Sequence, residues 1–298
     1  MFDSVLVVGA GAIGSLYAAK LSARTRVHVV ARPAHVEAVT RNGLTVTGAE
    51  SFVARVTAST SIEAVGPRTL LLLTTKVNDN RAAIEPLARQ IADDTTILCI
   101  QNGFGGEAIV REILDNAGKR PTVLRAITQF GAIFREPGVV DYKVAGQTRV
   151  EHGAGSADIA ALFTAAGLNA EISDSIEIDV WRKLIFNCVI NPITAITATE
   201  VGGIADPRLD ALKRLVIAEC LAVAHAEGVI FGEDFIETIG RVFGASRNIA
   251  SMRQDLIKGK ATEIDYMNGA VVRLGGRHGI ACPVNAALVA IVKAMENN

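Results

Sequence analysis

The sequence predicts an α/β protein in which a doubly wound parallel sheet is followed by an all-helical domain. Three observations predict this fold class. Short apolar strand-like runs alternate with helical segments in the first part of the chain, a glycine-rich turn follows the first run, and strand signals stop near Ser173. We therefore expect two domains, at residues 1–172 and 173–298.

The strands expected in the first domain are short, apolar and rich in β-branched residues. Ser4–Val8 and Arg26–Val30 flank a helix expected over Ala12–Ala23, which makes a βαβ unit. From Phe130 to Glu151, glycines and alternating residues predict short antiparallel strands that close the edge of the sheet. The remaining expected strands are Thr69–Thr74, Thr96–Ile100 and Thr122–Thr128, and the helices between them are Arg81–Ile91 and Gly106–Asn116.

The second domain shows only helical signals, several with apolar residues at a spacing of about 3.6. Gly228, Gly259, Gly279 and Pro283 mark helix ends. Because small molecules often bind in clefts between domains, we expect the site there. The expected helices are Ser175–Ile190, Pro207–Glu227, Gly232–Phe243, Ala245–Lys258, Thr262–Arg277 and Val284–Met295.

The composition excludes several classes of partner. Of the 298 residues, 30 are Lys or Arg and 31 are Asp or Glu, so the net charge is -1, and aromatic residues are scarce. Nucleic-acid binding normally needs a basic surplus and stacking aromatics, and is not expected. No apolar stretch approaches the length of a membrane span, so no membrane partner is expected.

The cysteines and histidines indicate a cytoplasmic protein without a metal site. The four cysteines are far apart in sequence, which favours buried thiols in a reducing cytoplasm over disulfides or zinc ligands. The five histidines are scattered, so no metal is expected.

A dinucleotide-binding motif follows the first expected strand. The segment reads Gly9-Ala10-Gly11-Ala12-Ile13-Gly14 and fits G-x-G-x-x-G. The first glycine allows a tight turn, the second lets the backbone approach a pyrophosphate, and the third allows close packing of helix on strand. The helix that follows offers free N–H groups to the phosphates. The alternative is a glycine-rich turn that binds nothing.

The end of the second strand indicates which cofactor is used. An acidic residue there would bind the ribose hydroxyls of NAD, but the sequence reads Val29-Val30-Ala31-Arg32. Arg32 can make a forked, charge-assisted contact with a 2′-phosphate. We therefore expect NADP(H), with a solvated surface arginine as the alternative.

Two further polar segments follow expected strands. Lys76 ends Thr74-Thr75-Lys76, and Asn102 lies in Gln101-Asn102-Gly103. Ligands bind outside the carboxyl ends of the strands in open α/β sheets. The alternatives are ordinary loop polarity and an Asn-Gly turn.

A polar row runs along an otherwise apolar helix of the second domain. Lys183, Asn187 and Asn191 are four residues apart, so on a helix they lie within about 80° of one another. Buried amide and ammonium groups are costly unless they are paired. The row therefore predicts a wall for a small polar substrate, with Lys183 as proton donor, or else a structural hydrogen-bonded stripe. Pro192 suggests a helix end or kink just after Asn191.

Ser251 and Glu263 form a second candidate group in the helical domain. Both lie in polar stretches and are candidates to face the cleft. For Glu263 the alternative is structural: Thr262 would cap a helix, and an acid in the first turn would favour its dipole.

Six stretches together resemble the 2-dehydropantoate 2-reductases, also called ketopantoate reductases. The match runs in register over nearly the whole chain. The resemblance implies a Rossmann domain followed by a helical domain like the carboxyl-terminal domain of 6-phosphogluconate dehydrogenase. It also implies NADPH-dependent reduction of 2-dehydropantoate to (R)-pantoate, on the pathway to pantothenate and coenzyme A. The six stretches are GAGAIG, VVAR, TTK, QNG, WRKLIFNCVINPITAI and SMRQDLIKGKATEIDYMNG.

The resemblance implies roles for the residues of the helical domain. Lys183 matches the family's catalytic lysine, which acts as general acid. Glu263 matches a glutamate that orients the cofactor and this lysine. Asn187 and Asn191 match substrate-binding asparagines, and Ser251 matches a serine that holds the substrate carboxylate.

The resemblance also implies cofactor contacts. Lys76, Asn102 and the backbone at Ala126 match positions that touch NADPH, and the position of Asn102 is also near the substrate. Arg32 matches the arginine that binds the 2′-phosphate.

The sequence departs from the family at Val201. Well-studied members often carry another substrate-contacting asparagine there, just before a glycine. The sequence therefore specifies the class of reaction more closely than it specifies which 2-oxo acid is the substrate. A related NADP-dependent 2-oxo acid reductase or 2-hydroxy acid dehydrogenase is one alternative, and a non-catalytic NADPH-binding sensor is another. The apolar helical domain leaves a homodimer open.

Overall fold

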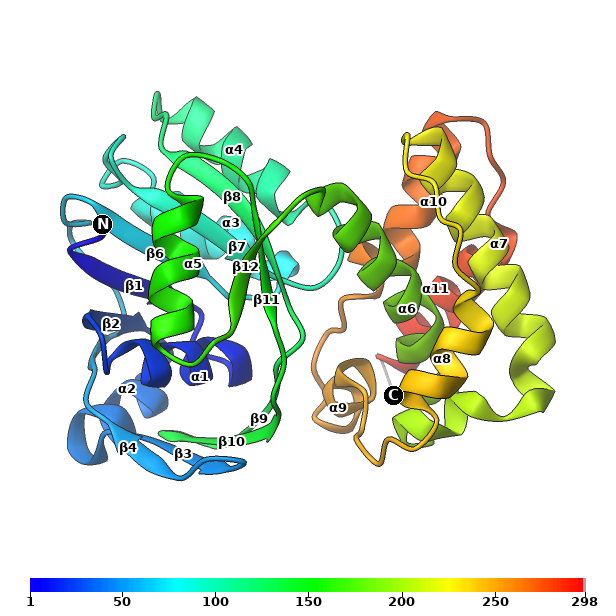
Figure 1. Ribbon diagram of the computed structural model, residues 1–298, viewed down its shortest axis with the longest axis horizontal. Helices are drawn as coiled ribbons and strands as arrows, with labels where there is room; N and C mark the ends of the chain where they lie inside the picture. The colour runs from blue at the N-terminus through cyan, green and yellow to red at the C-terminus, as the bar shows by residue number, and fades with distance from the viewer. Residues whose placement is uncertain (297–298) are drawn as a thin grey trace. The chain divides into compact units, whose positions relative to one another are not determined.

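The chain forms two compact units in a computed structural model that describes residues 1–296 (Figure 1). The sheet unit comprises Met1–Gln101 and Gly106–Ile176. The helical unit comprises the chain from Glu177 onward together with a short segment of the earlier chain, Asn102–Gly105. The fold class predicted from the sequence, α/β followed by all-helical, is confirmed.

The main sheet of the sheet unit has eight strands within the described residues, in the order β12-β11-β8-β7-β6-β1-β2-β5. The strands from β8 to β5 are parallel, and β11 runs antiparallel to β8. Val8 at the end of β1 lies level with Val30 of β2 and Leu73 of β6, so these strands end at one edge. The bounds are β1 Ser4–Val8, β2 Arg26–Val30, β5 Thr57–Ser59, β6 Thr69–Leu73, β7 Thr96–Ile100, β8 Thr122–Thr128, β11 Thr148–Glu151 and β12 Ala170–Ser173.

Helices cover both faces of the main sheet, which explains the continuous apolar runs of its central strands. Leu70 and Leu72 of β6 pack in one core with α1 (Ala12–Leu21) and α5 (Ser156–Ala165). Leu71 and Leu73 pack in the core on the opposite face of the sheet. The helices on that face were expected from the sequence as two continuous segments. Of these, α4 keeps its expected bounds, Gly106–Asn116, whereas 81–91 contains only α3 (Asn80–Ile84) and the 3₁₀ turn η2 (Glu85–Leu87).

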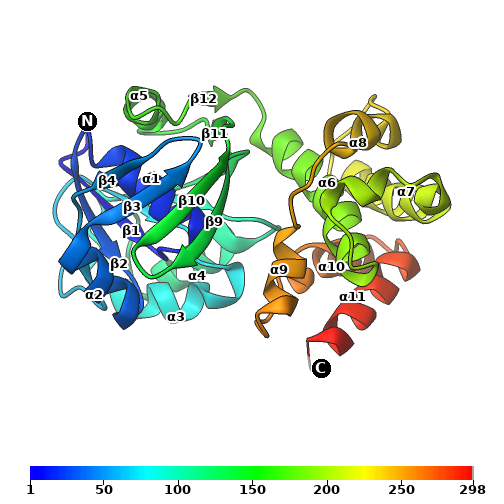
Figure 2. The ribbon, with the colours of Figure 1, turned by 90° about the horizontal axis from the view of Figure 1, so that it is seen from below.

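A second sheet of four strands, in the order β4-β3-β10-β9, covers the outer side of α1 (Figure 2). The expectation that residues 130–151 close the edge of the main sheet is therefore wrong, because only β11 of this stretch joins that sheet and β12 lies outside it at the edge. The reason is that α1 is buried from Gly14 to Leu21, so the side turned away from the main sheet needs a second cover, which β3, β4, β9 and β10 supply. The strands are β3 Leu44–Gly48, β4 Phe52–Ala54, β9 Gly131–Glu136 and β10 Val139–Val144, and the helix before β3 is α2, Pro33–Asn42.

In the helical unit, α6 contributes buried residues along most of its length to one apolar core, and α7 packs on both α10 and α11. Most of α6 is buried, as its apolar sequence predicts. Among residues 1–296, no helix is both long enough and apolar enough to cross a membrane. The helices are α6 Ile176–Ile196, α7 Asp210–Ala226, α8 Phe235–Phe243, α9 Ser251–Ile257, α10 Asn268–Arg277 and α11 Pro283–Met295, with 3₁₀ turns η3 Val201–Ala205, η4 Pro207–Leu209 and η5 Ile264–Tyr266.

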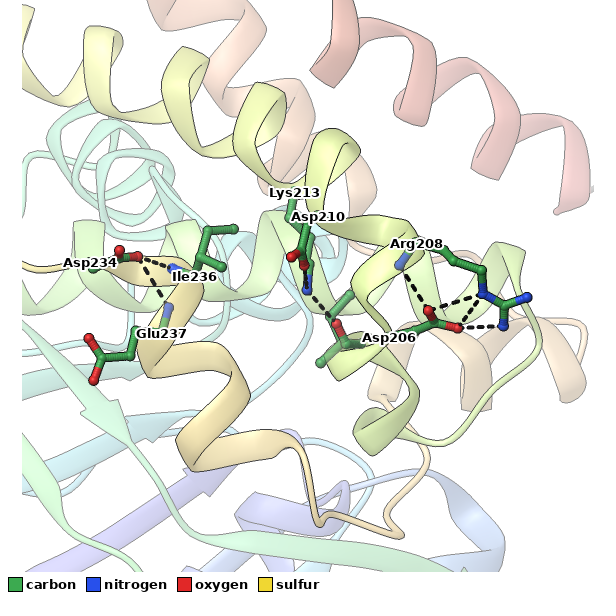
Figure 3. A network of polar contacts seen from close by, with 8 residues as sticks. Asp206, Arg208, Asp210, Lys213, Asp234, Ile236 and Glu237 are labelled. Carbon is green, nitrogen blue, oxygen red and sulfur yellow. Dashed lines mark hydrogen bonds and ion pairs between the residues drawn. The ribbon is translucent and has the colours of Figure 1, made fainter.

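A side-chain cap fixes where α8 begins (Figure 3). Asp234 accepts hydrogen bonds from the N–H groups of Ile236 and Glu237 at 2.8 and 3.1 Å, so α8 begins after it and not at Gly232. Lys213 of α7 is buried, and its ammonium donates to the carbonyl of Ile204 at 2.9 Å and pairs with Asp210.

Three other expected helices differ from the structure. Residues 245–250 are not helical, and the segment expected over 262–277 divides at Met267 into η5 and α10. The helix expected to end at Ile190 instead continues through Pro192 to Ile196. The expectation of a helix end at this proline is therefore wrong, because another helix supplies a donor for the carbonyl that the proline leaves without one, as described below.

Candidate active site

The glycine motif forms a tight turn at the carboxyl end of β1. Gly9 has a φ of 99°, and a Cβ there would lie 2.5 Å from the backbone nitrogen of Thr75. A Cβ on Gly14 would lie 2.4 Å from the carbonyl oxygen of Gly9. On Gly11, by contrast, a Cβ would meet no atom within 4 Å. The protein's own packing thus requires two of the three glycines, and the open side of Gly11 is where a ligand backbone has room to approach.

The position of this turn fits a dinucleotide. It follows β1, where the strand order changes direction, since β2 lies on one side of β1 and β6 on the other. Such a switch point is where open α/β sheets bind ligands. The N–H groups of Ala12, Ile13 and Gly14 in the first turn of α1 have no acceptor within the helix, and they present a positive dipole end.

A buried amide network joins the loops after β6 and β7 in the sheet unit. Asn80 is fully buried, and its Nδ2 donates to Gln101 Oε1 and to the carbonyl of Gly106, both at 3.1 Å. Gln101 Nε2 donates to the carbonyl of Thr75 at 2.8 Å. Asn80 and Gln101 could not be selected from the sequence, because a lone amide in a loop gives no sign that its partners lie elsewhere in the chain.

The other expected cofactor residues of the sheet unit lie at or near the same edge. Arg32 is exposed at the start of α2, and its guanidinium makes no hydrogen bond or ion pair with the residues that the structure describes. Lys76 is half-buried in the loop after β6. Ala126 of β8 is buried and lies level with Ile100, the last residue of β7.

Asn102 lies in the short segment that belongs to the helical unit. The next residues fix this segment: Phe104 N–H donates to the carbonyl of Tyr266 at 2.8 Å, and the Phe104 ring lies 5.6 Å from that of Trp181. Gly103 has a φ of 86°, and a Cβ on it would come within 2.6 Å of the Tyr266 carbonyl oxygen. Gly103 therefore allows close contact with this backbone, a packing role that the sequence pattern does not indicate.

The structure brings three of the expected substrate residues together in the helical unit. Asn191 Nδ2 donates to Asn187 Oδ1 at 3.2 Å, and Ser251 Oγ donates to Asn191 Oδ1 at 3.3 Å. Asn191 is buried, Asn187 is half-buried, and Ser251 is exposed at the start of α9. The row predicted from the four-residue spacing therefore gains a fourth polar group from another helix.

One donor of this row has no partner within the protein. Asn187 Nδ2 is buried, and no acceptor lies within hydrogen-bond distance of it among residues 1–296. Buried polar atoms are nearly always paired, so this orphan is expected to meet an oxygen of a bound molecule or a water. In this respect the row differs from a stripe whose amides are all paired within the protein.

Lys183 and Glu263 form the charged end of the site. Burial lowers the pKa of Lys183 to about 8, while the negative charge of Glu263 opposes that shift. Glu263 is buried and precedes η5, well before α10 begins. It therefore does not lie in the first turn of a long helix, as the structural alternative required.

The position of the missing family asparagine is occupied by an apolar, buried side chain. Val201 begins η3 and packs in the core of the helical unit, and its N–H donates to the carbonyl of Asn248 at 2.8 Å. A hydrogen bond from this side chain to a substrate is not available. Among residues 1–296, no three or more His, Cys, Asp or Glu side chains gather where they could hold a metal ion.

Two family models match most of the chain. The model described as "Ketopantoate reductase PanE/ApbA" matches residues 5–155, and "Ketopantoate reductase PanE/ApbA C terminal" matches residues 175–296. Among curated relatives, the 2-dehydropantoate 2-reductase of Pyrococcus horikoshii is 34% identical over 98% of this chain and 97% of its own length.

Solved structures agree with these matches. A PanE/ApbA family ketopantoate reductase from Ralstonia eutropha JMP134 superposes with a TM-score of 0.92 at 34% identity, covering 99% of this chain and 98% of that one. A D-mandelate dehydrogenase in complex with NADH superposes with a TM-score of 0.86 at 25% identity, covering 99% of each chain. Taken with the fold and the residues of the site, the full-length matches place this chain in the ketopantoate reductase family.

Proposed function

We propose that this protein reduces 2-dehydropantoate to (R)-pantoate with NADPH, and that Lys183 is the general acid. One observation carries the proposal: a lysine whose charge is supported by Glu263 stands on the same helix as two hydrogen-bonded amides, Asn187 and Asn191, and the buried Nδ2 of Asn187 has no partner among residues 1–296. An ammonium beside neutral hydrogen-bond donors is what a 2-oxo acid needs when its carbonyl oxygen becomes negative.

The sheet unit supplies a binding site that fits a nicotinamide dinucleotide. The open side of Gly11 and the first turn of α1 suit a pyrophosphate, and the exposed guanidinium of Arg32 suits a 2′-phosphate. When bound, the reduced cofactor supplies the hydride. Arg32 is therefore the residue on which the choice of NADPH over NADH depends.

The helical unit supplies the groups that act on the substrate. Neutral pH is below the pKa of Lys183, which is about 8. The lysine is therefore protonated and can give a proton to the alkoxide oxygen. Asn187 Nδ2 donates to a substrate oxygen, which satisfies the orphan donor. Ser251 and Asn191 bind the carboxylate end, and the serine hydroxyl, which otherwise donates to Asn191 Oδ1 at 3.3 Å, turns its hydrogen to the carboxylate.

The setting that suits this reaction is the cytoplasm. The four cysteines are buried and unpaired, as is usual in a reducing compartment, where NADPH is also kept.

The experiment that tests the proposal is a panel of 2-oxo acids, followed by the loss of NADPH absorbance. The panel contains 2-dehydropantoate, a branched apolar 2-oxo acid and an aromatic one. We expect 2-dehydropantoate to give the highest kcat/KM. Binding of NADPH without turnover of any acid would instead indicate a non-catalytic sensor.

Val201 favours a second candidate substrate class. An apolar side chain replaces the asparagine that family members use to contact the substrate, and this loss removes one way of rejecting acids that lack a hydroxyl. A D-mandelate dehydrogenase shares this fold, so the same scaffold occurs in an enzyme named for an aromatic 2-hydroxy acid. A higher kcat/KM for an apolar or aromatic acid than for 2-dehydropantoate would assign the protein to this class.

A further inference from the structure

Pro192 creates a gap in the hydrogen bonding of α6. In an α-helix the N–H of each residue donates to the carbonyl four residues earlier, and proline has no N–H. The carbonyl of Cys188 therefore has no donor from its own helix. Cys188 is fully buried, so this oxygen needs a partner inside the protein.

Asn268, the first residue of α10, fills the gap. Its Nδ2 donates to the carbonyl oxygen of Cys188 at 3.0 Å. The second hydrogen of the same amide goes to Asn285 Oδ1 at 2.8 Å. Both asparagines are completely buried. The donor missing from α6 is thus replaced by one from a residue 80 positions later in the sequence.

Glu219 of α7 fixes which way these amides face. Its carboxylate accepts from the N–H groups of Val284 and Asn285 at the start of α11, at 2.8 and 2.9 Å. It also accepts from Asn285 Nδ2 at 2.7 Å. Because Nδ2 of Asn285 is held by the carboxylate, its Oδ1 faces Asn268. Asn268 must then present its donor group, which is the group that Cys188 needs.

The contact between Asn268 and the Cys188 carbonyl lies within the stretch of α6 that carries the polar row. Lys183 and Asn187 precede Cys188, whereas Asn191 follows it and lies next to Pro192. The residue before Asn268 also touches the row, since Asn191 Nδ2 lies 3.7 Å from Met267 Sδ. A change in the peptide at Cys188 would therefore turn Asn191 away from the other two residues.

We infer that Asn268 is a positioning residue for the reaction proposed above. It gives the Cys188 carbonyl the donor that Pro192 withholds, and so keeps α6 helical across the proline. The same contact keeps Asn191 in line with Lys183 and Asn187. The inference rests on the proposed function in one respect, namely that the polar row binds the 2-oxo acid. The hydrogen-bond replacement itself is a property of the fold.

A double-mutant cycle between Asn268→Ala and Pro192→Ala tests this inference. Alanine at 192 restores a backbone N–H that can donate to Cys188 within the helix. We expect Asn268→Ala alone to raise the KM for the 2-oxo acid about tenfold or more, with the KM for NADPH within about twofold of wild type. Adding Pro192→Ala should recover most of that loss, because the carbonyl regains a partner.

Leu274→Ala is the matched control. Leu274 is a buried core residue of the same helix α10, and no hydrogen bond of its side chain is involved. We expect this variant to lower Tm without a selective rise in the KM for the 2-oxo acid. Rescue of Leu274→Ala by Pro192→Ala to the same extent would overturn the inference, because the effect would then be general stabilisation.

Stability measurements keep the inference testable apart from the reaction. If wild-type protein reduces no 2-oxo acid, the proposed function fails, and the cycle is measured by Tm alone. A loss in the double variant smaller than the sum of the single losses supports the replacement of the donor, whereas additive losses overturn it. If Asn268→Ala does not fold, a folded double variant supports the inference and an unfolded one overturns it.

Discussion

The negative charge of Glu263 raises the pKa of Lys183 against the effect of burial, which lowers it to about 8. Burial disfavours the charged form of a lysine, and a nearby carboxylate favours it. The balance leaves Lys183 protonated at neutral pH, with a pKa much closer to the working pH than that of an exposed lysine. A general acid is most effective in this range.

This balance predicts the pH dependence of the reaction. Lys183 must carry its proton to act as an acid, so kcat/KM should be highest below about pH 8 and fall as the pH rises through that value. In Glu263→Gln the charge that favours the ammonium is gone, so the fall should begin at lower pH. The measurement is the pH profile of kcat/KM for the 2-oxo acid at saturating NADPH.

Glu233→Gln serves as the control for this profile. Glu233 belongs to the same unit and forms an ion pair with Arg182, the neighbour of Lys183, at 2.7 Å. Its removal should leave the fall near pH 8 unchanged. A wild-type profile that stays flat through this range would argue against Lys183 as the acid.

Removing the lysine should separate binding from chemistry. Lys183→Ala should lower kcat about 10²- to 10⁴-fold, the usual contribution of a positioned acid. NADPH affinity should persist, because the expected cofactor residues other than Asn102 and Glu263 lie in the sheet unit. Single-turnover rates and a fluorescence titration with NADPH measure the two effects.

Arg182→Ala is the matched variant for this experiment. Arg182 precedes Lys183 on α6 and pairs with Asp179 and Glu233 through a partly exposed guanidinium. Its loss should leave kcat within about twofold of wild type, since partly exposed ion pairs contribute little. Near wild-type turnover in Lys183→Ala would show that another group supplies the proton.

The sheet unit was largely predictable because its signals are local. Four strands of the main sheet, Ser4–Val8, Arg26–Val30, Thr96–Ile100 and Thr122–Thr128, have the bounds expected from their apolar runs. The second sheet was not predictable in this way. Val140 of β10 pairs with Val46 of β3, and no local pattern records a partner so far away in sequence.

The polar row of α6 was predictable from spacing alone, since residues four apart share a helix face. What could not be predicted was that the helix continues beyond Pro192. A local reading treats proline as a helix breaker, whereas here the amide of Asn268 satisfies the carbonyl that the proline leaves free. The outcome depended on a contact between distant residues, which the sequence pattern does not contain.

The three glycines of the motif should respond differently to an added methyl group. Gly11 has a φ of -74° and open space around its Cβ position, so Gly11→Ala should leave Tm unchanged. If a pyrophosphate approaches this backbone, the methyl group should weaken NADPH binding by about 1–3 kcal/mol, or about 5- to 150-fold in Kd. Thermal unfolding and calorimetric titration measure the two quantities.

Gly14→Ala provides the contrast. Its methyl group would lie 2.4 Å from the Gly9 carbonyl oxygen and from Thr74 Oγ1, so the free energy of unfolding should fall by about 1–3 kcal/mol. If Gly11→Ala kept full NADPH affinity, the cofactor would have to bind away from this turn.

Arg32 should decide between the two nicotinamide cofactors. Its guanidinium is exposed and makes no ion pair with the described part of the chain, so its charge is available for a 2′-phosphate. A charge-assisted hydrogen bond is worth about 1.5–3 kcal/mol. Arg32→Ala should therefore lower kcat/KM for NADPH about 10- to 100-fold and leave kcat/KM for NADH nearly unchanged.

Arg41→Ala is the control for this prediction. Arg41 lies on the same helix and pairs with Glu37, so its removal should leave the ratio of kcat/KM for NADPH to kcat/KM for NADH as in wild type. A wild-type preference for NADH would contradict the role of Arg32, because phosphate recognition would then contribute nothing to cofactor choice.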